Sequence, residues 1–141
     1  MQDVTLTLPM LPDMELTASK TASAMGEHIR MSRDKIDEIQ MAVVEATINA
    51  FEHSGSPDRK VRIHFHVLGT EGDPTGLQIT VTDHGTGIPD GRLPMPGNDG
   101  RKSAPLPQKR GHGLRIINGL MDSVDIRSDE QGTTVVMTKL C

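Results

Sequence analysis

Apolar residues recur along this chain at intervals that change from one segment to the next. Polar and apolar residues alternate over 3–8, which predicts a first β-strand. Residues 13–30 are expected to form a helix, with Leu16, Ala22 and Met25 among its apolar positions. A strand followed by a helix therefore opens the predicted order of elements.

The most regular helical pattern follows a break at residues 31–33 and ends near His53. Its apolar residues recur at intervals of three and four, as Ile36, Ile39, Val43, Ala46 and Ala50. Ser32 or Asp34 is suited to cap the start, because either side chain accepts a hydrogen bond from a backbone N–H. Beyond the end, Gly55 can adopt a left-handed cap and Pro57 follows it.

Two alternating segments come next and predict neighbouring strands. The first has one apolar face, formed by Val61, Ile63, Phe65 and Val67. The second has a matching face, formed by Leu77, Ile79 and Val81. A turn is expected between them over 71–74. Because the opposite faces are polar, we expect helices to cover only one side of the sheet.

The segment 89–110 interrupts these patterns. Its 22 residues contain five of the nine prolines and three glycines. A loop of this length in a compact domain is either functional or evidence that an element has been misassigned. A helix over about 112–122 and strands at 123–128 and 133–139 complete the predicted order of elements.

Composition narrows the classes of function. The 141 residues correspond to one domain, 1–141, and carry a net charge of −4, which argues against direct nucleic-acid binding. With two Phe and no Tyr or Trp, stacking on bases is disfavoured as well. The single cysteine, Cys141, excludes a disulfide within the chain. No apolar run approaches the roughly 20 residues of a membrane span, so no membrane is expected and the cytoplasm is the expected compartment.

Polar residues at particular positions suggest a site. On the long helix, Glu45, Asn49 and His53 are spaced four apart and form one stripe at the edge of the apolar face. Taken alone, such a stripe is more often a solvated flank of the helix. The functional interpretation is a carboxylate base, an amide metal ligand and a polar neighbour on one rigid element.

Two glycine-containing stretches add to this stripe. Asp83 continues an apolar strand face and is followed by Gly85 and Gly87, which fits either an Asx turn or an acceptor for a ligand's amino group. The stretch 111–114, Gly-His-Gly-Leu, opens the next helix, and the free N–H groups there can hold an anion or simply form a hinge.

Other familiar motifs are absent or incomplete. Neither glycine pair extends to the dinucleotide fingerprint, and 97–103 has the wrong spacing for a P-loop. His64 and His66 share a strand face but lack a third ligand at a sensible spacing. The basic residues of the long loop are expected to be mostly solvated, with one or two able to reach a phosphate: Arg92, Arg101, Lys102, Lys109 and Arg110.

Taken in order, these pieces resemble the GHKL or Bergerat-fold ATPases, which include gyrase, heat-shock chaperones, histidine kinases and mismatch-repair proteins. Residues 45–53 resemble the N box, 83–87 the first glycine box and 111–114 the second. The ending, 121–124 and 132–135, is similar to the bacterial anti-sigma-factor serine kinases. The resemblance implies an α+β two-layer α/β sandwich, the histidine-kinase-like ATPase fold, with helices on one face of a mixed, mostly antiparallel sheet. It also implies a mobile ATP lid at about 88–111.

The resemblance implies ATP and Mg²⁺ as cofactors. Asp83 would accept a hydrogen bond from the adenine amino group, helped by Thr133, and Asn49 would ligate Mg²⁺. Other implied nucleotide-binding residues are His53, Gly85, Gly87, Ile88, Gly111, His112, Gly113 and Leu114.

The implied activity is that of an anti-sigma factor with serine kinase activity. Glu45 would activate the hydroxyl of a partner protein's serine, and Lys109 or Arg110 would stabilise charge on the transferred phosphoryl group. The partners would be a sigma factor and an anti-anti-sigma protein of the STAS type, and a homodimer is expected. Two alternatives stay open: a nucleotide-sensing binding module without kinase activity, and the detached catalytic domain of a histidine kinase. For the latter, His28 lacks the surroundings of a phospho-acceptor.

Overall fold

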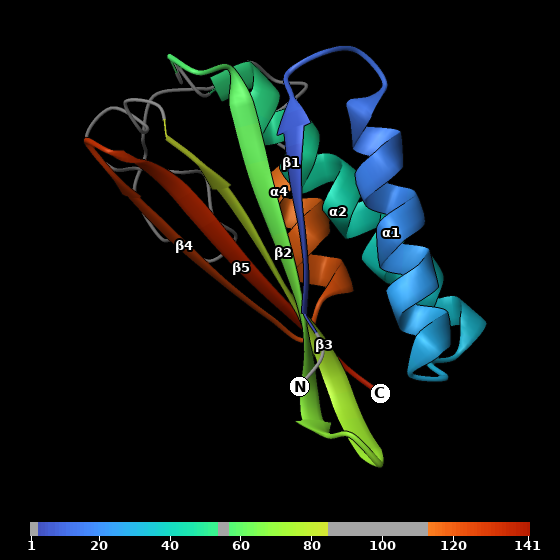
Figure 1. The fold of residues 1–141 in the computed structure, drawn as a ribbon. Coiled ribbons are helices and arrows are strands. Elements are labelled where there is room, and N and C mark those ends of the chain that lie inside the picture. The colour runs from blue at the N-terminus through green and yellow to red at the C-terminus, as the bar shows by residue number, and fades with distance from the viewer. Residues whose placement is uncertain (1–2, 54–56, 85–112) are drawn as a thin grey trace.

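The computed structural model describes residues 3–53, 57–84 and 113–141, and they form a five-stranded sheet with helices on one face (Figure 1). In chain order the elements are β1 (Asp3–Pro9), α1 (Met14–His28), α2 (Arg33–His53), β2 (Lys60–Thr70), β3 (Asp73–Asp83), α4 (Gly113–Leu120), β4 (Ser123–Asp129) and β5 (Gly132–Leu140). Each predicted strand and helix is therefore present. Their ends differ from the prediction by at most two residues, apart from the start of β3 and the end of β2, which runs three residues beyond Val67.

The strands lie in the order β1-β2-β3-β5-β4, and each pairing among the described strands is antiparallel. The α+β class and the single helical layer are confirmed. The sheet was expected to be mixed, but within the described residues it contains no parallel pair. Hairpin turns join β2 to β3 and β4 to β5. Between β3 and β5 the chain includes α4 and β4, and β5 then pairs with β3 in the antiparallel direction.

Helix α2 starts where the sequence predicted. The backbone N–H of Lys35 donates to Ser32 Oγ at 3.3 Å, so Ser32 is the capping residue and Asp34 lies in the first turn. The last residue of α2 is His53, and Gly55, the predicted left-handed cap, lies outside the described residues. The cap fixes the point at which this 21-residue helix begins.

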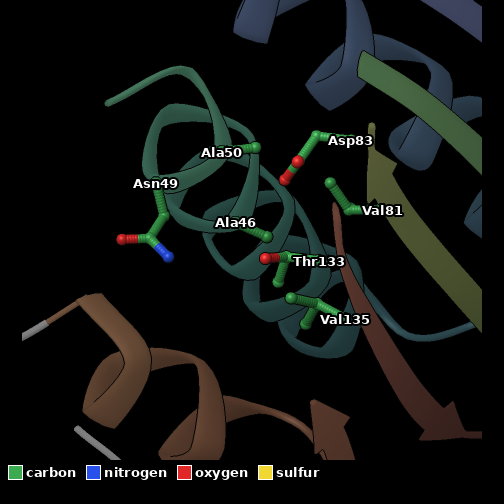
Figure 2. A pocket seen from close by; sticks show the side chains of 7 residues that line it. All are labelled: Ala46, Asn49, Ala50, Val81, Asp83, Thr133 and Val135. Carbon is green, nitrogen blue, oxygen red and sulfur yellow. The ribbon is translucent and has the colours of Figure 1, made fainter. Parts of the chain in front are cut away.

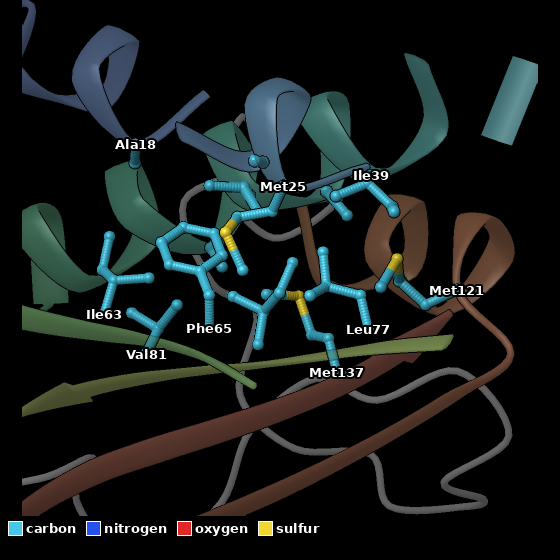
Figure 3. Close-up of a cluster of buried hydrophobic side chains, with 14 of the residues drawn as sticks. Ala18, Met25, Ile39, Ile63, Phe65, Leu77, Val81, Met121 and Met137 are labelled. Carbon is cyan, nitrogen blue, oxygen red and sulfur yellow. The ribbon is translucent and has the colours of Figure 1, made fainter. Parts of the chain in front are cut away.

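The core lies between the inner face of the sheet and the three helices (Figure 3). Phe65 and Ile63 from β2 and Ile39 from α2 are fully buried there. Leu16, which the sequence grouped with the apolar positions of α1, is instead 49% exposed. It lies two residues from buried Ala18, which is about 200° around a helix, so it points away from the sheet.

The hairpin between β2 and β3 is tighter than predicted. Asp73 pairs with Thr70 and Pro74 with Gly69, so only two residues of the expected 71–74 turn remain unpaired. The register shifts between Leu68 and Gly69, and Gly69 has a φ of +91°. An irregularity of this kind lets a proline enter the end of a strand, because the lost N–H falls where the ladder is already interrupted.

The outer face of the sheet is polar, and its histidines have a partner. His64 Nε2 lies 3.0 Å and His66 Nδ1 2.7 Å from Asp3 Oδ1, which joins β1 to β2. Within the described ranges no group of three or more ligating side chains is arranged to hold a metal ion. Nor does any helix in those ranges have the length and apolarity needed to cross a membrane.

Candidate functional site

A small pocket, partly open to solvent, lies between α2 and the adjoining ends of β3 and β5 (Figure 2). Its lining residues are Ala46, Asn49, Ala50, Val81, Asp83, Thr133 and Val135. Three of the residues singled out from the sequence, Asn49, Asp83 and Thr133, are thus brought together from distant parts of the chain. The register explains part of this, because Asp83 is paired directly with Thr133.

Asp83 occupies the position that the strand pattern predicted. It ends β3 on the inward-facing side, is 4% exposed, and points its carboxylate toward the Ala46–Ala50 side of α2 (Figure 2). A carboxylate held in such a place requires hydrogen-bond donors around it. The end of β3 therefore presents a fixed acceptor at the wall of the pocket.

The β5 part of this wall depends on Gly132, whose role the sequence did not reveal. Its φ is +138°, and a Cβ placed there would lie 2.0 Å from the carbonyl oxygen of Asp83. Only glycine therefore allows β5 to begin this close to the end of β3. The neighbouring Thr133 hydroxyl lies 3.1 Å from Ser128 Oγ, which holds it at the pocket's edge.

The other walls are apolar, and the sequence had assigned them to the core or to strand faces. Ala46 and Ala50 face the pocket from α2, while Val81 and Val135 face it from the sheet. Two alanines four residues apart leave an open strip between helix and sheet, because a larger side chain at either position would fill it. A narrow apolar slot with a carboxylate at its end suits a flat ring that carries an amino group. Without a structure, alanines on an apolar stripe give no sign of this role.

The polar stripe of α2 flanks this slot. Asn49 is 8% exposed, and Glu45, one turn earlier, is half-buried, so the stripe lies at the edge of the core as its spacing predicted. Figure 2 shows the Asn49 amide pointing away from Asp83. An amide oxygen is a suitable ligand for a hard cation. His53 is the last residue of α2, and the position of its side chain is not among the described features.

Helix α4 begins at Gly113, with Leu114 in its first turn, and packs against α2. Its start supplies backbone N–H groups that have no partner within the helix. The whole of the expected lid, 88–111, lies outside the described residues, and so do the remaining predicted residues: Gly85, Gly87, Ile88, Lys109, Arg110, Gly111 and His112. Their predicted roles stay predictions.

A helix-covered antiparallel sheet with a pocket between its longest helix and two strand ends is the architecture of one class of nucleotide-binding domains. Residues 8–139 match the family model of the histidine kinase-like ATPase domain, and the chain therefore belongs to this family. Membership in a family of ATPase domains makes this an ATP-binding domain.

Within that family, the similar curated proteins are bacterial regulators. The chain is 30% identical to the anti-sigma F factor of Oceanobacillus iheyensis, over 97% of this chain and 91% of that protein. It is 28% identical to the serine-protein kinase RsbW of Listeria innocua, over 96% of this chain and 85% of that protein. Both likenesses extend over nearly the whole sequence.

Solved structures show the same fold. The RsbU and RsbW domains of Rv1364c from Mycobacterium tuberculosis match with a TM-score of 0.69 at 19% identity, over 99% of this chain and 33% of that one. The histidine kinase domain of Erythrobacter litoralis EL346 matches with a TM-score of 0.52 at 21% identity, over 93% of this chain and 64% of that one. At these identities the comparison supports the fold alone.

Proposed function

We propose that the protein is an anti-sigma factor with serine kinase activity, using ATP to phosphorylate an anti-anti-sigma protein. The names of the two curated relatives, a serine-protein kinase and an anti-sigma factor, support this role. The observation that carries the proposal is the buried Asp83 carboxylate at the end of an apolar slot, beside the Glu45–Asn49 stripe of α2.

The slot would hold adenine. Asp83 accepts a hydrogen bond from the exocyclic amino group, and the Thr133 hydroxyl, directly across the strand pair, lies within the same wall. Ala46 and Val135 then pack on the two faces of the ring. A base with a carbonyl in place of the amino group would set two acceptors against each other, which disfavours guanine.

The phosphates would extend toward Asn49 and the start of α4. The Asn49 amide oxygen fits Mg²⁺, because that ion prefers oxygen ligands and takes few of them from the protein. The free N–H groups at Gly113 favour an anion at the helix start. Bound Mg²⁺ would neutralise charge on the phosphates during transfer.

Glu45 would act as the base. The serine oxygen of the partner attacks the γ-phosphorus, its proton passes to the Glu45 carboxylate, and the bond to the β–γ bridging oxygen breaks to release ADP. Glu45 lies one helical turn from Asn49, so base and metal ligand project from the same rigid element. Lys109 or Arg110 would supply positive charge to the transferring group, as the resemblance implied.

The partners follow from the same proposal. A sigma factor is sequestered by the protein, and a STAS-type anti-anti-sigma protein is both its phosphorylation substrate and its competitor. We propose a homodimer as the working form and the cytoplasm, where sigma factors meet RNA polymerase, as its compartment.

The site is tested by titrating ATP with Mg²⁺ into wild type, Asp83→Asn and Asn49→Ala by calorimetry. Both variants should remain folded and bind ATP at least tenfold more weakly, since each loses a contact to the base or the metal. Unchanged affinity in either folded variant would refute that residue's assignment.

The kinase activity is tested separately with the cognate anti-anti-sigma protein and labelled ATP. Wild type should transfer phosphate to serine, and Glu45→Gln should bind ATP normally yet transfer it at least a hundredfold more slowly. ATP binding without transfer by wild type would contradict the kinase proposal and favour a nucleotide-sensing module.

A further inference from the structure

Lys139 stands where a core residue belongs. The inward-facing positions of β5 are Val135, Met137 and Lys139, and Lys139 is only 7% exposed. Burying an ammonium group is unfavourable unless it is paired and hydrogen-bonded. A lysine at this point of the core must therefore have specific hydrogen-bond and ion-pair partners, and these show which elements it joins.

The two partners of Lys139 belong to different helices. Its Nζ lies 2.7 Å from Glu38 Oε1 on α2, and it also donates to the backbone carbonyl oxygen of Leu120, the last residue of α4. The final carbonyls of a helix have no partner within the helix and carry partial negative charge. Since α4 has no basic residue in its own last turn, Lys139 supplies the positive charge from β5.

Further bonds fasten the same end of α4. The backbone N–H of Asp122 donates to Thr138 O at 2.9 Å, and the Asp122 carboxylate accepts from the backbone N–H of Leu140 at 2.7 Å. The C-terminal end of α4 is thus tied to β5 on one side and, through Lys139, to Glu38 on the other.

Glu38 lies on the same stripe of α2 as the proposed catalytic residues. It precedes Glu45 by seven residues and Asn49 by eleven, which at about 100° per residue places all three within about 20° of one line. Helix α4 has eight residues, so its start at Gly113 is about 12 Å from the end that Lys139 holds. With this end of α4 held, its packing along α2 determines the gap between the two helices at the other end.

We propose that Lys139 is a positioning residue that sets the separation between the start of α4 and the Glu45–Asn49 stripe of α2. The inference rests on the proposed function, because this gap is where the phosphates would lie. The bonds of Lys139 to Glu38 and to Leu120 form what we call the clamp. The adenine slot shares α2 and β5 with it, but Val135 of the slot lies four residues, about 13 Å, along β5 from Lys139, with the buried Met137 between them. The clamp therefore governs binding of the phosphates and leaves binding of the base unaffected.

The test compares ADP with adenosine in Lys139→Met, a substitution that keeps the length of the side chain and removes its charge. Affinities are measured by calorimetry for ADP with Mg²⁺ and by ligand-observed NMR for adenosine. ADP should bind at least fivefold more weakly, whereas the affinity for adenosine should change less than twofold. Unfolding in urea, measured alongside, should remain cooperative, because the half-exposed Glu38 stays solvated when its partner is removed.

Lys35→Met is the matched control. Lys35 also extends from α2 to β5, where its Nζ donates to Leu140 O at 3.2 Å, but it is not bonded to α4. This variant should bind both ligands as wild type does. If Lys139→Met fails to fold, Glu38→Leu weakens the clamp from the side of α2 and should lower the affinity for ADP at least twofold without changing that for adenosine.

Two results would overturn the inference. In a folded Lys139→Met protein, ADP affinity could remain at the wild-type level, or the affinities for ADP and adenosine could fall together, as expected for a general loosening of the core. Asp83→Asn tests the site assignment separately from the clamp, because this variant should bind both ADP and adenosine more weakly. Failure of wild type to bind either ligand would refute the proposed function, and the clamp with it.

Discussion

Asp83 and Gly132 meet where two strands that are distant in the sequence come into contact. The carboxylate is the proposed acceptor for the base, while the glycine allows the backbone of β5 to approach it. The sequence identified Asp83 because a charged residue on an apolar strand face is conspicuous. It gave no comparable sign for Gly132, whose requirement arises only from the backbone atoms that lie against it.

Gly132→Ala should destabilise the protein by at least about 2 kcal/mol, because the backbone conformation is one that L-residues rarely adopt and the new Cβ would overlap Asp83 O. Urea unfolding measures this change, and ATP affinity should fall with it as Asp83 is displaced. Gly72→Ala is the control, since a methyl group added there would have nothing within 4 Å, and its unfolding free energy should change by less than about 0.5 kcal/mol. Equal stability of the two variants would contradict this account.

At the level of helices and strands, the periodicity of the sequence was sufficient for most of the fold. Ser32 starts α2, and the alternation of β2 and β3 predicted their inner faces correctly. What could not be predicted depends on contacts between elements. Lys139 can occupy an inward-facing position of β5 because two helices supply its partners. Likewise, the hydrogen-bond partner that His64 and His66 share is Asp3, about 60 residues earlier in the chain.

The contribution of Asp3 to folding stability, through its bonds from β1 to the histidines of β2, should depend on pH. The pKa of the Asp3 carboxyl lies below its ordinary value of 3.8, and the hydrogen bond from His66 is the largest cause. Desolvation raises this pKa, whereas the charges of His66 and His64 and the hydrogen bond from His64 lower it further. Because the folded-state pKa is lowered, the carboxylate's contribution to stability is complete above the unfolded value. It is lost as the pH falls through the folded value.

Wild type should therefore be more stable than Asp3→Asn near pH 6, and this difference should shrink as the pH is lowered below 3.8. Urea midpoints across pH 2–6 measure it. Asp73→Asn, at an exposed carboxylate in the β2–β3 hairpin, serves as the control and should track wild type. A difference between wild type and Asp3→Asn that is constant over this range would contradict the assigned cause.

For the whole molecule, the candidate pocket is shared by α2, β3 and β5, so a ligand that binds there links elements from most of the chain. Such a ligand binds the folded state and not the unfolded state, so it raises the free energy of unfolding. ATP at 100 times its Kd should raise the unfolding free energy of wild type by about 2.7 kcal/mol. In Asp83→Asn at the same concentration the gain should be about 1.4 kcal/mol or less. Equal gains in urea titrations would place ATP elsewhere.

The position of β5 has a consequence for synthesis of the chain. Although β5 comes late in the sequence, it lies inside the sheet, between β3 and β4. While a ribosome is still making the preceding residues, β3 has an unpaired edge and Asp83 has no Thr133 opposite it. Nascent chains that lack β5 should therefore not retain nucleotide, and the capacity to bind it should first arise once β5 has left the exit tunnel and paired with β3.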